Sequence, residues 1–192
     1  MTKIPAPGGR SWTAAAVPYD CLEMQRAGES IAPDLTRPII GYRDWVQVGD
    51  EILSPLARTR WEAGPMQAEC LPSCREARGL WRTASAHLGP APDPGCACGI
   101  YALFAPSRPR GRERLALVRG AVVLWGRIEL HQRGMRAEFA RMVTLALPSS
   151  RRHAEAVARV AELLDVEAVR TRDLPGAALA YGEPLEPTLI PT

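Results

Sequence analysis

Four of the five cysteines form two close pairs, Cys70-x3-Cys74 and Cys96-x-Cys98, and His87 lies between the pairs. Thiolate sulfur and imidazole nitrogen are preferred ligands of Zn²⁺, and two such pairs can bring four ligands to one point. A site closed by four protein ligands is structural, because it leaves no open position for water. The spacing predicts a structural zinc site made by Cys70, Cys74, Cys96 and Cys98, in which His87 could replace one cysteine.

The same cysteines allow three other interpretations. They could be ordinary core or loop cysteines, or two of them could form a redox pair. A third interpretation is catalysis, in which Cys98 is a nucleophile and His131 or His87 is its base. A catalytic cysteine needs a nearby base and an electropositive setting that stabilises the thiolate. The sequence does not show whether these side chains meet, so these interpretations stay open beside the zinc site.

A second group of chemically active side chains surrounds the segment Gln132-Arg133-Gly134. One interpretation is a ligand pocket floored by Trp125, with Arg136 holding an anion. The other is a ladder of solvent-facing charge pairs, each of which stabilises a sheet by about 0.2–1 kcal/mol. The candidate ligand-binding residues of the first interpretation are Trp125, His131, Arg136 and Glu138.

Composition restricts the class of protein. The 192 residues are 46% hydrophobic and 23% charged, which is sufficient for a real core, and the net charge of +3 is only mildly basic. An arginine-rich loop at 108–114 makes a weak nucleic-acid binder an alternative, but Glu113 and the modest charge favour a solvated loop. The sequence has no run of 18 apolar residues and no signal-peptide pattern, so we expect a cytoplasmic protein without a membrane partner. Disulfides are rare in that compartment, which favours metal binding or redox chemistry for clustered cysteines.

Short strands are expected in the first half of the chain. The β-branched and aromatic residues of Ile39–Val48 predict a strand, and Gly49-Asp50 predicts a turn into a return strand at Glu51–Leu56. Weaker patterns predict a short strand at Trp61–Ala68 and either a short buried strand or the first turn of a helix at Gly99–Phe104. Between the last two lies a proline- and glycine-rich insert that cannot form a long regular element, and a bound metal would explain it.

The segment Leu115–Leu147 has the pattern of a β-hairpin that turns at Gln132-Arg133-Gly134. Alternation predicts a more apolar face of the first strand, formed by Val122, Leu124, Gly126, Ile128 and Leu130. In the second strand it places Met135, Ala137, Phe139, Arg141 and Val143 on one side.

A helix is predicted after Pro148, at Arg151–Leu164, with Ser149 or Ser150 as its N-terminal cap. Its apolar residues recur at spacings of three and four, so the helix should pack one face on the sheet. A final strand is expected at Val166–Val169.

The chain therefore divides into an N-terminal extension at 1–38, a domain at 39–173 and a proline-rich C-terminal tail at 174–192. The extension has little periodicity, apart from a possible short helix at about Asp20–Ala27, and the tail should be extended on the surface. The expected fold class is α+β, with a mostly antiparallel sheet, a cysteine-bearing insert and one C-terminal helix.

Two motifs in the central region carry a resemblance. They are Cys96-Ala97-Cys98-Gly99-Ile100-Tyr101-Ala102 and the run from Leu124-Trp125-Gly126 to Arg136-Ala137-Glu138, and they are preceded by Gly41, Tyr42 and Trp45. Over about residues 41–147 the chain resembles a group of uncharacterised proteins from actinobacteria and similar GC-rich bacteria. The resemblance implies a bacterial source and carries no activity.

The function expected from the sequence is a non-enzymatic binding or regulatory module stabilised by zinc. Its partner would be an unknown protein or small-molecule ligand. The alternatives are a small enzyme that uses a cysteine nucleophile or a metal-bound water, and a weak nucleic-acid binder. A closed site of four thiolates and a catalytic site with an open position differ in coordination, so the metal centre is the feature that separates them.

Overall fold

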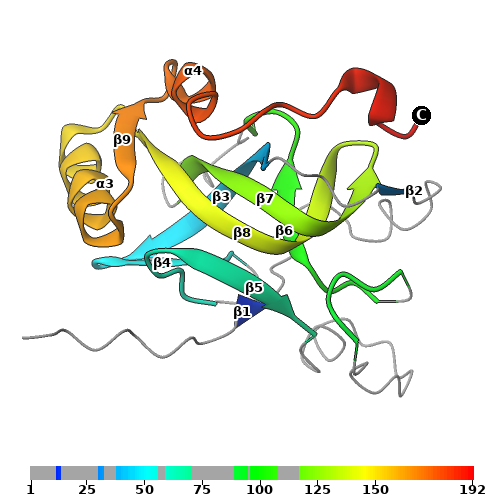
Figure 1. The fold of residues 1–192 in the computed structure, drawn as a ribbon. Helices are drawn as coiled ribbons and strands as arrows, with labels where there is room; N and C mark the ends of the chain where they lie inside the picture. Colours follow the sequence, from blue (N-terminus) through cyan, green and yellow to red (C-terminus); the bar gives the residue numbers. More distant parts are fainter. Residues whose placement is uncertain are drawn as a thin grey trace, which may run out of the picture.

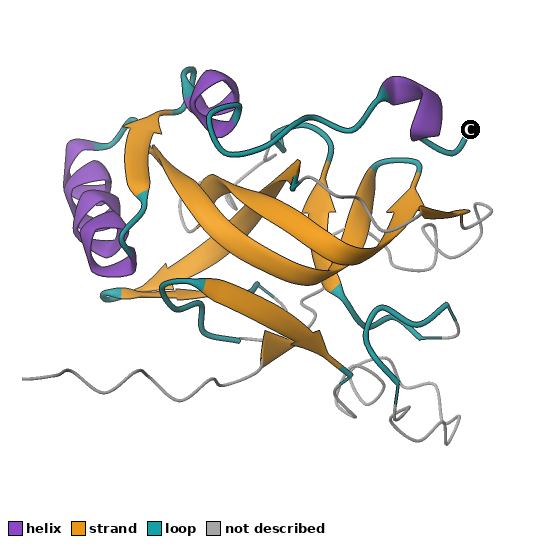
Figure 2. Cartoon of the chain, viewed as in Figure 1, coloured by secondary structure: helices purple, strands orange, loops and turns teal. Residues whose placement is uncertain are grey.

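The computed structural model describes residues 12–13, 30–32, 38–55, 59–70, 89–94, 96–107 and 117–192. A mostly antiparallel sheet with few helices dominates these residues, as expected for the α+β class (Figures 1 and 2). The elements follow one another as β1 (Trp12–Thr13), β2 (Ser30–Ala32), β3 (Ile39–Val48), β4 (Glu51–Leu53), β5 (Pro65–Glu69), β6 (Ile100–Leu103), β7 (Leu117–His131), β8 (Gly134–Leu147), α3 (Arg151–Leu164), β9 (Glu167–Arg170), α4 (Leu174–Ala178) and the 3₁₀ turn η2 (Pro187–Leu189).

The long hairpin of β7 and β8 is the centre of the sheet, and the two strands join through a tight turn at Gln132-Arg133. The predicted hairpin is confirmed. Its residues pair from Gly120 with Leu145 at the open end to His131 with Gly134 at the turn. Both strands are largely buried on both faces, so a two-sided hydrophobic environment rather than simple alternation explains the apolar run Ala121–Leu124.

The outer edges of the hairpin are covered by shorter strands. Along β8 these are β6, β5 and β9 in turn, and along β7 they are β3 and β2. A bridge between Tyr42 of β3 and Leu103 of β6 then closes the ring β3–β7–β8–β6. The four strands therefore form a small closed barrel, in which none of the four has an entirely unpaired edge.

The predicted alternation of β8 is wrong beyond Glu138. Met135 and Ala137 lie in the main core as expected, but Ala140 and Met142 lie there as well, whereas Val143 packs on the opposite face. The cause is a bulge, because two β7 residues, Gly126 and Arg127, face a single residue of β8. Gly126 has a φ of +76°, a conformation that favours glycine.

The helix predicted after Pro148 is confirmed as α3, and it packs on the sheet through Val157, Val160 and Ala161. Ser150 occupies its N-cap position, although its side chain makes no capping hydrogen bond. The predicted strand after the helix is also present, as β9.

The C-terminal segment differs from the expected extended tail. It begins with the short helix α4, whose Leu174 and Ala178 are fully buried against the outer face of the sheet. Further on, Glu183 pairs with the start of β3: its N–H donates to the Pro38 carbonyl, and its carbonyl accepts from the Ile40 N–H. Proline content predicted a surface segment here because proline restricts regular structure, but Pro175 is accommodated in the first turn of α4.

The helix expected at about Asp20–Ala27 and the arginine-rich loop at 108–114 lie outside the described residues. Among the residues that are described, no helix has the length and apolar composition needed to cross a bilayer.

Candidate metal centre

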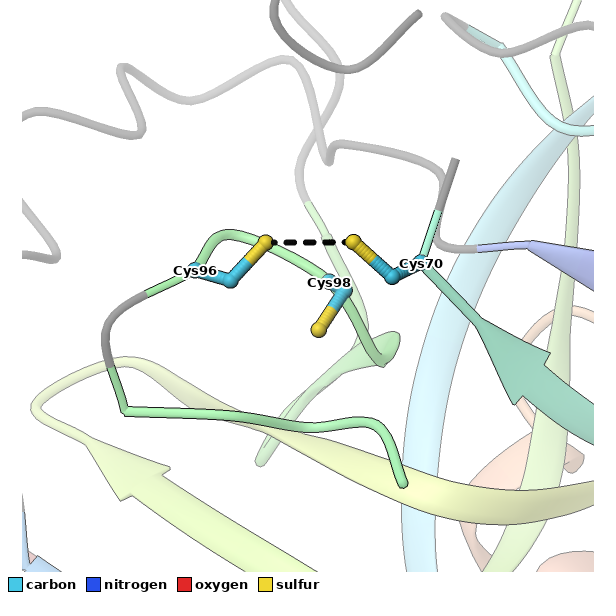
Figure 3. Close-up of side chains that lie close together, drawn as sticks. All are labelled: Cys70, Cys96 and Cys98. Atoms are coloured by element: carbon cyan, nitrogen blue, oxygen red, sulfur yellow. Dashed lines mark hydrogen bonds between the residues drawn. The ribbon is translucent and has the colours of Figure 1, made fainter. Parts of the chain in front are cut away.

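Cys70, Cys96 and Cys98 come together at one end of the barrel, and their sulfur atoms all lie within 4.8 Å of one another. The Sγ atoms of Cys70 and Cys96 are 3.5 Å apart and are directed toward one another (Figure 3). In a tetrahedral zinc site with bonds of about 2.3 Å, neighbouring sulfur atoms are about 3.8 Å apart. The three thiols could therefore hold a metal ion after only small adjustments.

Two separate segments supply these sulfur atoms. Cys70 directly follows β5, while Cys96 and Cys98 lie in the segment just before β6, which is defined here as the cysteine loop, residues 89–99. β5 and β6 pair with consecutive stretches of the same edge of β8. The sheet therefore fixes the separation between the first cysteine and the C-x-C pair, although 25 residues lie between Cys70 and Cys96 in the sequence.

The cysteines differ in exposure. Cys98 is fully buried and Cys96 nearly so, whereas Cys70 is partly exposed. Burial raises the pKa of the Cys98 thiol to about 12, and the nearby Cys96 and Cys70 act in the same direction, while a hydrogen bond from the Asp93 backbone opposes them. Without a metal, Cys98 is therefore a protonated thiol at neutral pH. A divalent cation would reverse this preference, because a coordinated thiol is deprotonated.

The buried guanidinium of Arg136 holds the cysteine loop through hydrogen bonds to its carbonyl groups. The Nη1 of Arg136 donates to the Cys98 carbonyl at 3.2 Å and also to the Cys96 carbonyl, and its Nη2 donates to the Asp93 carbonyl at 3.3 Å. Glu129 faces Arg136 across β7 and β8, and a carboxylate oxygen lies 2.5 Å from Nη2. Both side chains are only about 2% exposed, so the ion pair is shielded from water. One residue of the sheet thus contacts the loop at both cysteines of the C-x-C pair and at Asp93 before it.

Gly99 is a site residue that the sequence reasoning missed. Its φ is +123°, and a Cβ built there would lie only 3.0 Å from the Cβ of Arg136 and 3.2 Å from that of Pro92. Glycine is therefore required where the chain leaves Cys98 and passes over Arg136. The Cys-Gly dipeptide at the end of the C-x-C pair was the available signal, because glycine commonly allows a backbone to approach another group closely.

The other predicted site residues are distributed as follows. Cys74 and His87, the remaining candidate metal ligands, lie outside the described residues. His131 is buried, with its Nε2 4.0 Å from a Glu129 oxygen. The prediction of a solvent-facing ladder is therefore wrong for Glu129, His131 and Arg136, since the strands on either side of the hairpin cover them.

Trp125 and Glu138 lie farther from the hairpin turn, at the bulge, and both are partly exposed. Trp125 stacks on Phe139 with ring centroids 5.8 Å apart, and a Glu138 oxygen accepts a hydrogen bond from the Arg127 N–H at 3.3 Å. The structure therefore places two of the four candidate ligand-binding residues at a surface and two in the interior. Ligand binding by the four stays a prediction.

Comparisons with known proteins do not extend this description. No family model, no curated protein and no solved structure matches the chain. The cysteine cluster and its support by Arg136 are consequently the observations on which a functional conclusion must rest.

Proposed function

We propose that the protein is a non-enzymatic binding or regulatory module that is stabilised by one structural zinc ion. The observation that supports this proposal is the convergence of three thiols, Cys70, Cys96 and Cys98, from two separate segments. Thiolate ligands favour Zn²⁺ and iron–sulfur clusters over Mg²⁺ or Ca²⁺, which prefer oxygen. Cys70 has a second cysteine four residues later, so Cys74 is the proposed fourth ligand, with His87 as the alternative.

The protonation of Cys98 favours a structural role over a catalytic one. A nucleophilic cysteine has a lowered pKa and some access to substrate. Cys98 has the opposite properties, because its pKa is raised to about 12 and its side chain is fully buried. With Cys74 or His87 as the fourth ligand, the coordination sphere would be closed and would leave no position for a metal-bound water. These properties argue against both the cysteine nucleophile and the hydrolytic metal.

The short distance between two of the thiols supports a second candidate, a redox pair. Cys70 and Cys96 are 3.5 Å apart, so a small movement would allow a disulfide. The intact mass of the protein separates the two candidates. A zinc protein retains all its thiols after unfolding, whereas a disulfide protein is two hydrogen atoms lighter and has two fewer reactive thiols.

The deciding experiment is elemental analysis of protein purified without added metal or chelator. We expect one zinc per chain in the wild type and in Cys21→Ser, the control that removes the cysteine outside both pairs. We expect Cys98→Ser to lose most of the zinc. Absence of any metal from a folded wild type, with all thiols freely reactive, contradicts the proposal, and iron with visible colour would replace zinc by an iron–sulfur cluster.

Partner contact is proposed at the bulge of the hairpin, where Trp125 and Glu138 are partly exposed. A large aromatic side chain that is anchored on Phe139 can offer a rigid contact at little entropic cost. The same proposal includes a location in the cytoplasm and a bacterial origin of the protein. Trp125→Ala should weaken partner binding and leave the zinc content unchanged, whereas a loss of zinc in this variant would show that the two properties are not separate.

A further inference from the structure

The cysteine loop has no regular secondary structure over its described residues, yet side chains of the barrel hold its carbonyl groups in place. Besides the three carbonyls that accept from Arg136, the Ala97 carbonyl accepts from the Tyr101 hydroxyl at 2.9 Å. The Pro92 carbonyl accepts from the Nη1 of Arg127 at 3.4 Å. Buried carbonyls that lack a partner are costly, and the side chains that donate to these carbonyls come from β6, β7 and β8.

Arg136 has the central place among these donors. It lies directly opposite Glu129 of β7 on one side and Tyr101 of β6 on the other, so three neighbouring strands fix its backbone. Its two terminal nitrogens reach the carbonyls of both Cys96 and Cys98 and of Asp93. A lysine could not make this set of contacts, because its ammonium is a compact charge without a planar fork of donors.

We propose that Arg136, oriented by Glu129, is the positioning residue of the metal site and holds Cys96 and Cys98 in metal-binding geometry before the metal arrives. The proposal rests on the proposed function, since its ligand is the same metal. In this proposal the buried ion pair of Arg136 and Glu129 orients the metal ligands in addition to packing in the core. A bare ion pair would neutralise its own charges, whereas here the guanidinium also makes three contacts with the loop that carries two ligands.

Partners of metal ligands often control affinity, and their loss typically costs 10–100-fold in metal binding. The measurement is competition between the protein and a chromophoric chelator for Zn²⁺, together with the visible spectrum of the Co²⁺-loaded protein. Arg136→Lys should weaken zinc binding by about 10–100-fold and change the Co²⁺ bands, because the sulfur ligands move. The matched control is Arg141→Lys on the same strand, where the side chain is exposed and both measurements should equal those of the wild type.

Hydrogen exchange of the metal-free protein tests the positioning without any metal. The Cys96 N–H donates to the Asp93 carbonyl at 2.9 Å, within the turn that Arg136 holds. We expect this amide to exchange faster in Arg136→Lys than in the wild type, while the amides of β7 and β8 keep their protection. Faster exchange in a wild-type background that bound neither Zn²⁺ nor Co²⁺ would show that Arg136 holds the turn but would overturn both the metal site and the proposed function. Unchanged exchange in a protein that binds zinc would overturn the positioning role alone.

Two outcomes overturn the inference. The first is a folded Arg136→Lys protein with wild-type zinc affinity, Co²⁺ spectrum and Cys96 exchange. The second outcome comes from another variant, which is needed only if Arg136→Lys does not fold. Glu129→Gln then takes its place, because it keeps the side-chain shape and leaves Arg136 intact but less firmly oriented. Faster Cys96 exchange in a folded Glu129→Gln protein supports the proposal, and unchanged exchange overturns it.

Discussion

Gly99→Ala gives the sharpest test of how the C-x-C pair is held. The left-handed φ of +123° strains any residue with a Cβ, and such strain costs about 1–3 kcal/mol. The new methyl group also meets two Cβ atoms at 3.0 and 3.2 Å, and these are attached directly to backbone and cannot rotate away. Overpacking of this kind costs about 1–3 kcal/mol. Because one backbone shift relieves part of both effects, we expect a loss of about 2–4 kcal/mol.

The assay is urea unfolding of the metal-free and zinc-loaded proteins, followed by tryptophan fluorescence. For a chain of this size each kcal/mol corresponds to about 2–4 °C in melting temperature, so a thermal melt gives a second estimate. Gly176→Ala is the matched control. It lies in α4, has no left-handed φ and would place its Cβ in open space, so it should be neutral or stabilising by up to about 1 kcal/mol.

The size of the effect should differ between the two forms of the protein. Displacement of Gly99 moves Cys98 away from the other two sulfur atoms, so Gly99→Ala should lose more stability when zinc is present than when it is absent. A Gly99→Ala protein as stable as Gly176→Ala, with unchanged zinc affinity, would refute the reasoning from close contact and backbone strain.

Three further predictions follow from the fold and the site. Leu174→Ala should lower the free energy of unfolding by about 2–5 kcal/mol, because this side chain is fully buried. Leu179→Ala, at an exposed position, should change it by less than about 0.5 kcal/mol. Equal effects of the two substitutions would contradict the docking of α4. Chelation of the metal should leave the far-ultraviolet circular dichroism almost unchanged, because the core extends well beyond the cysteines, and wholesale unfolding would show that the barrel depends on the metal. In the metal-free protein the pKa of the Cys98 thiol is about 12 when folded and 9.0 when unfolded, so the unfolded chain loses this proton first. The free energy of unfolding should therefore fall as the pH rises above about 9. Cys98→Ser should remove this pH dependence in urea titrations at about pH 8 to 10, and an identical pH dependence in both proteins would contradict the prediction.

Local patterns in the sequence were sufficient for the long hairpin and for α3. Both are regular elements with a clear period. Gly134 marks the turn of the hairpin, and Pro148 separates the end of β8 from the start of α3. The switch of faces along β8 was not predictable in the same way, because it depends on the pairing of Gly126 and Arg127 with one residue of a different strand. α4 was missed since five residues carry too little periodicity to outweigh nearby prolines.

The candidate site was only partly predictable. Clustered cysteines pointed to Cys70, Cys96 and Cys98, and the structure brings these together. For Arg136 the sequence allows a solvent-facing charge pair or an anion-binding residue, and both interpretations assume that its side chain is accessible. Its actual environment is set by β6, which covers this end of β8 from a separate part of the chain. Long-range coverage of this kind leaves no signal in the residues next to Arg136.

The arrangement of β5 and β6 along one edge of β8 has a consequence for how the chain can change over evolution. The barrel holds both ends of the connection between Cys70 and Cys96, so its closure does not depend on the length of the connection. Closure entropy in general grows slowly with the length of a connection, by about 0.6 kcal/mol for each doubling of the number of residues. We therefore expect that sequence inserted away from Cys74 and His87, and with it new recognition elements, would leave the barrel and its three gathered thiols as they are.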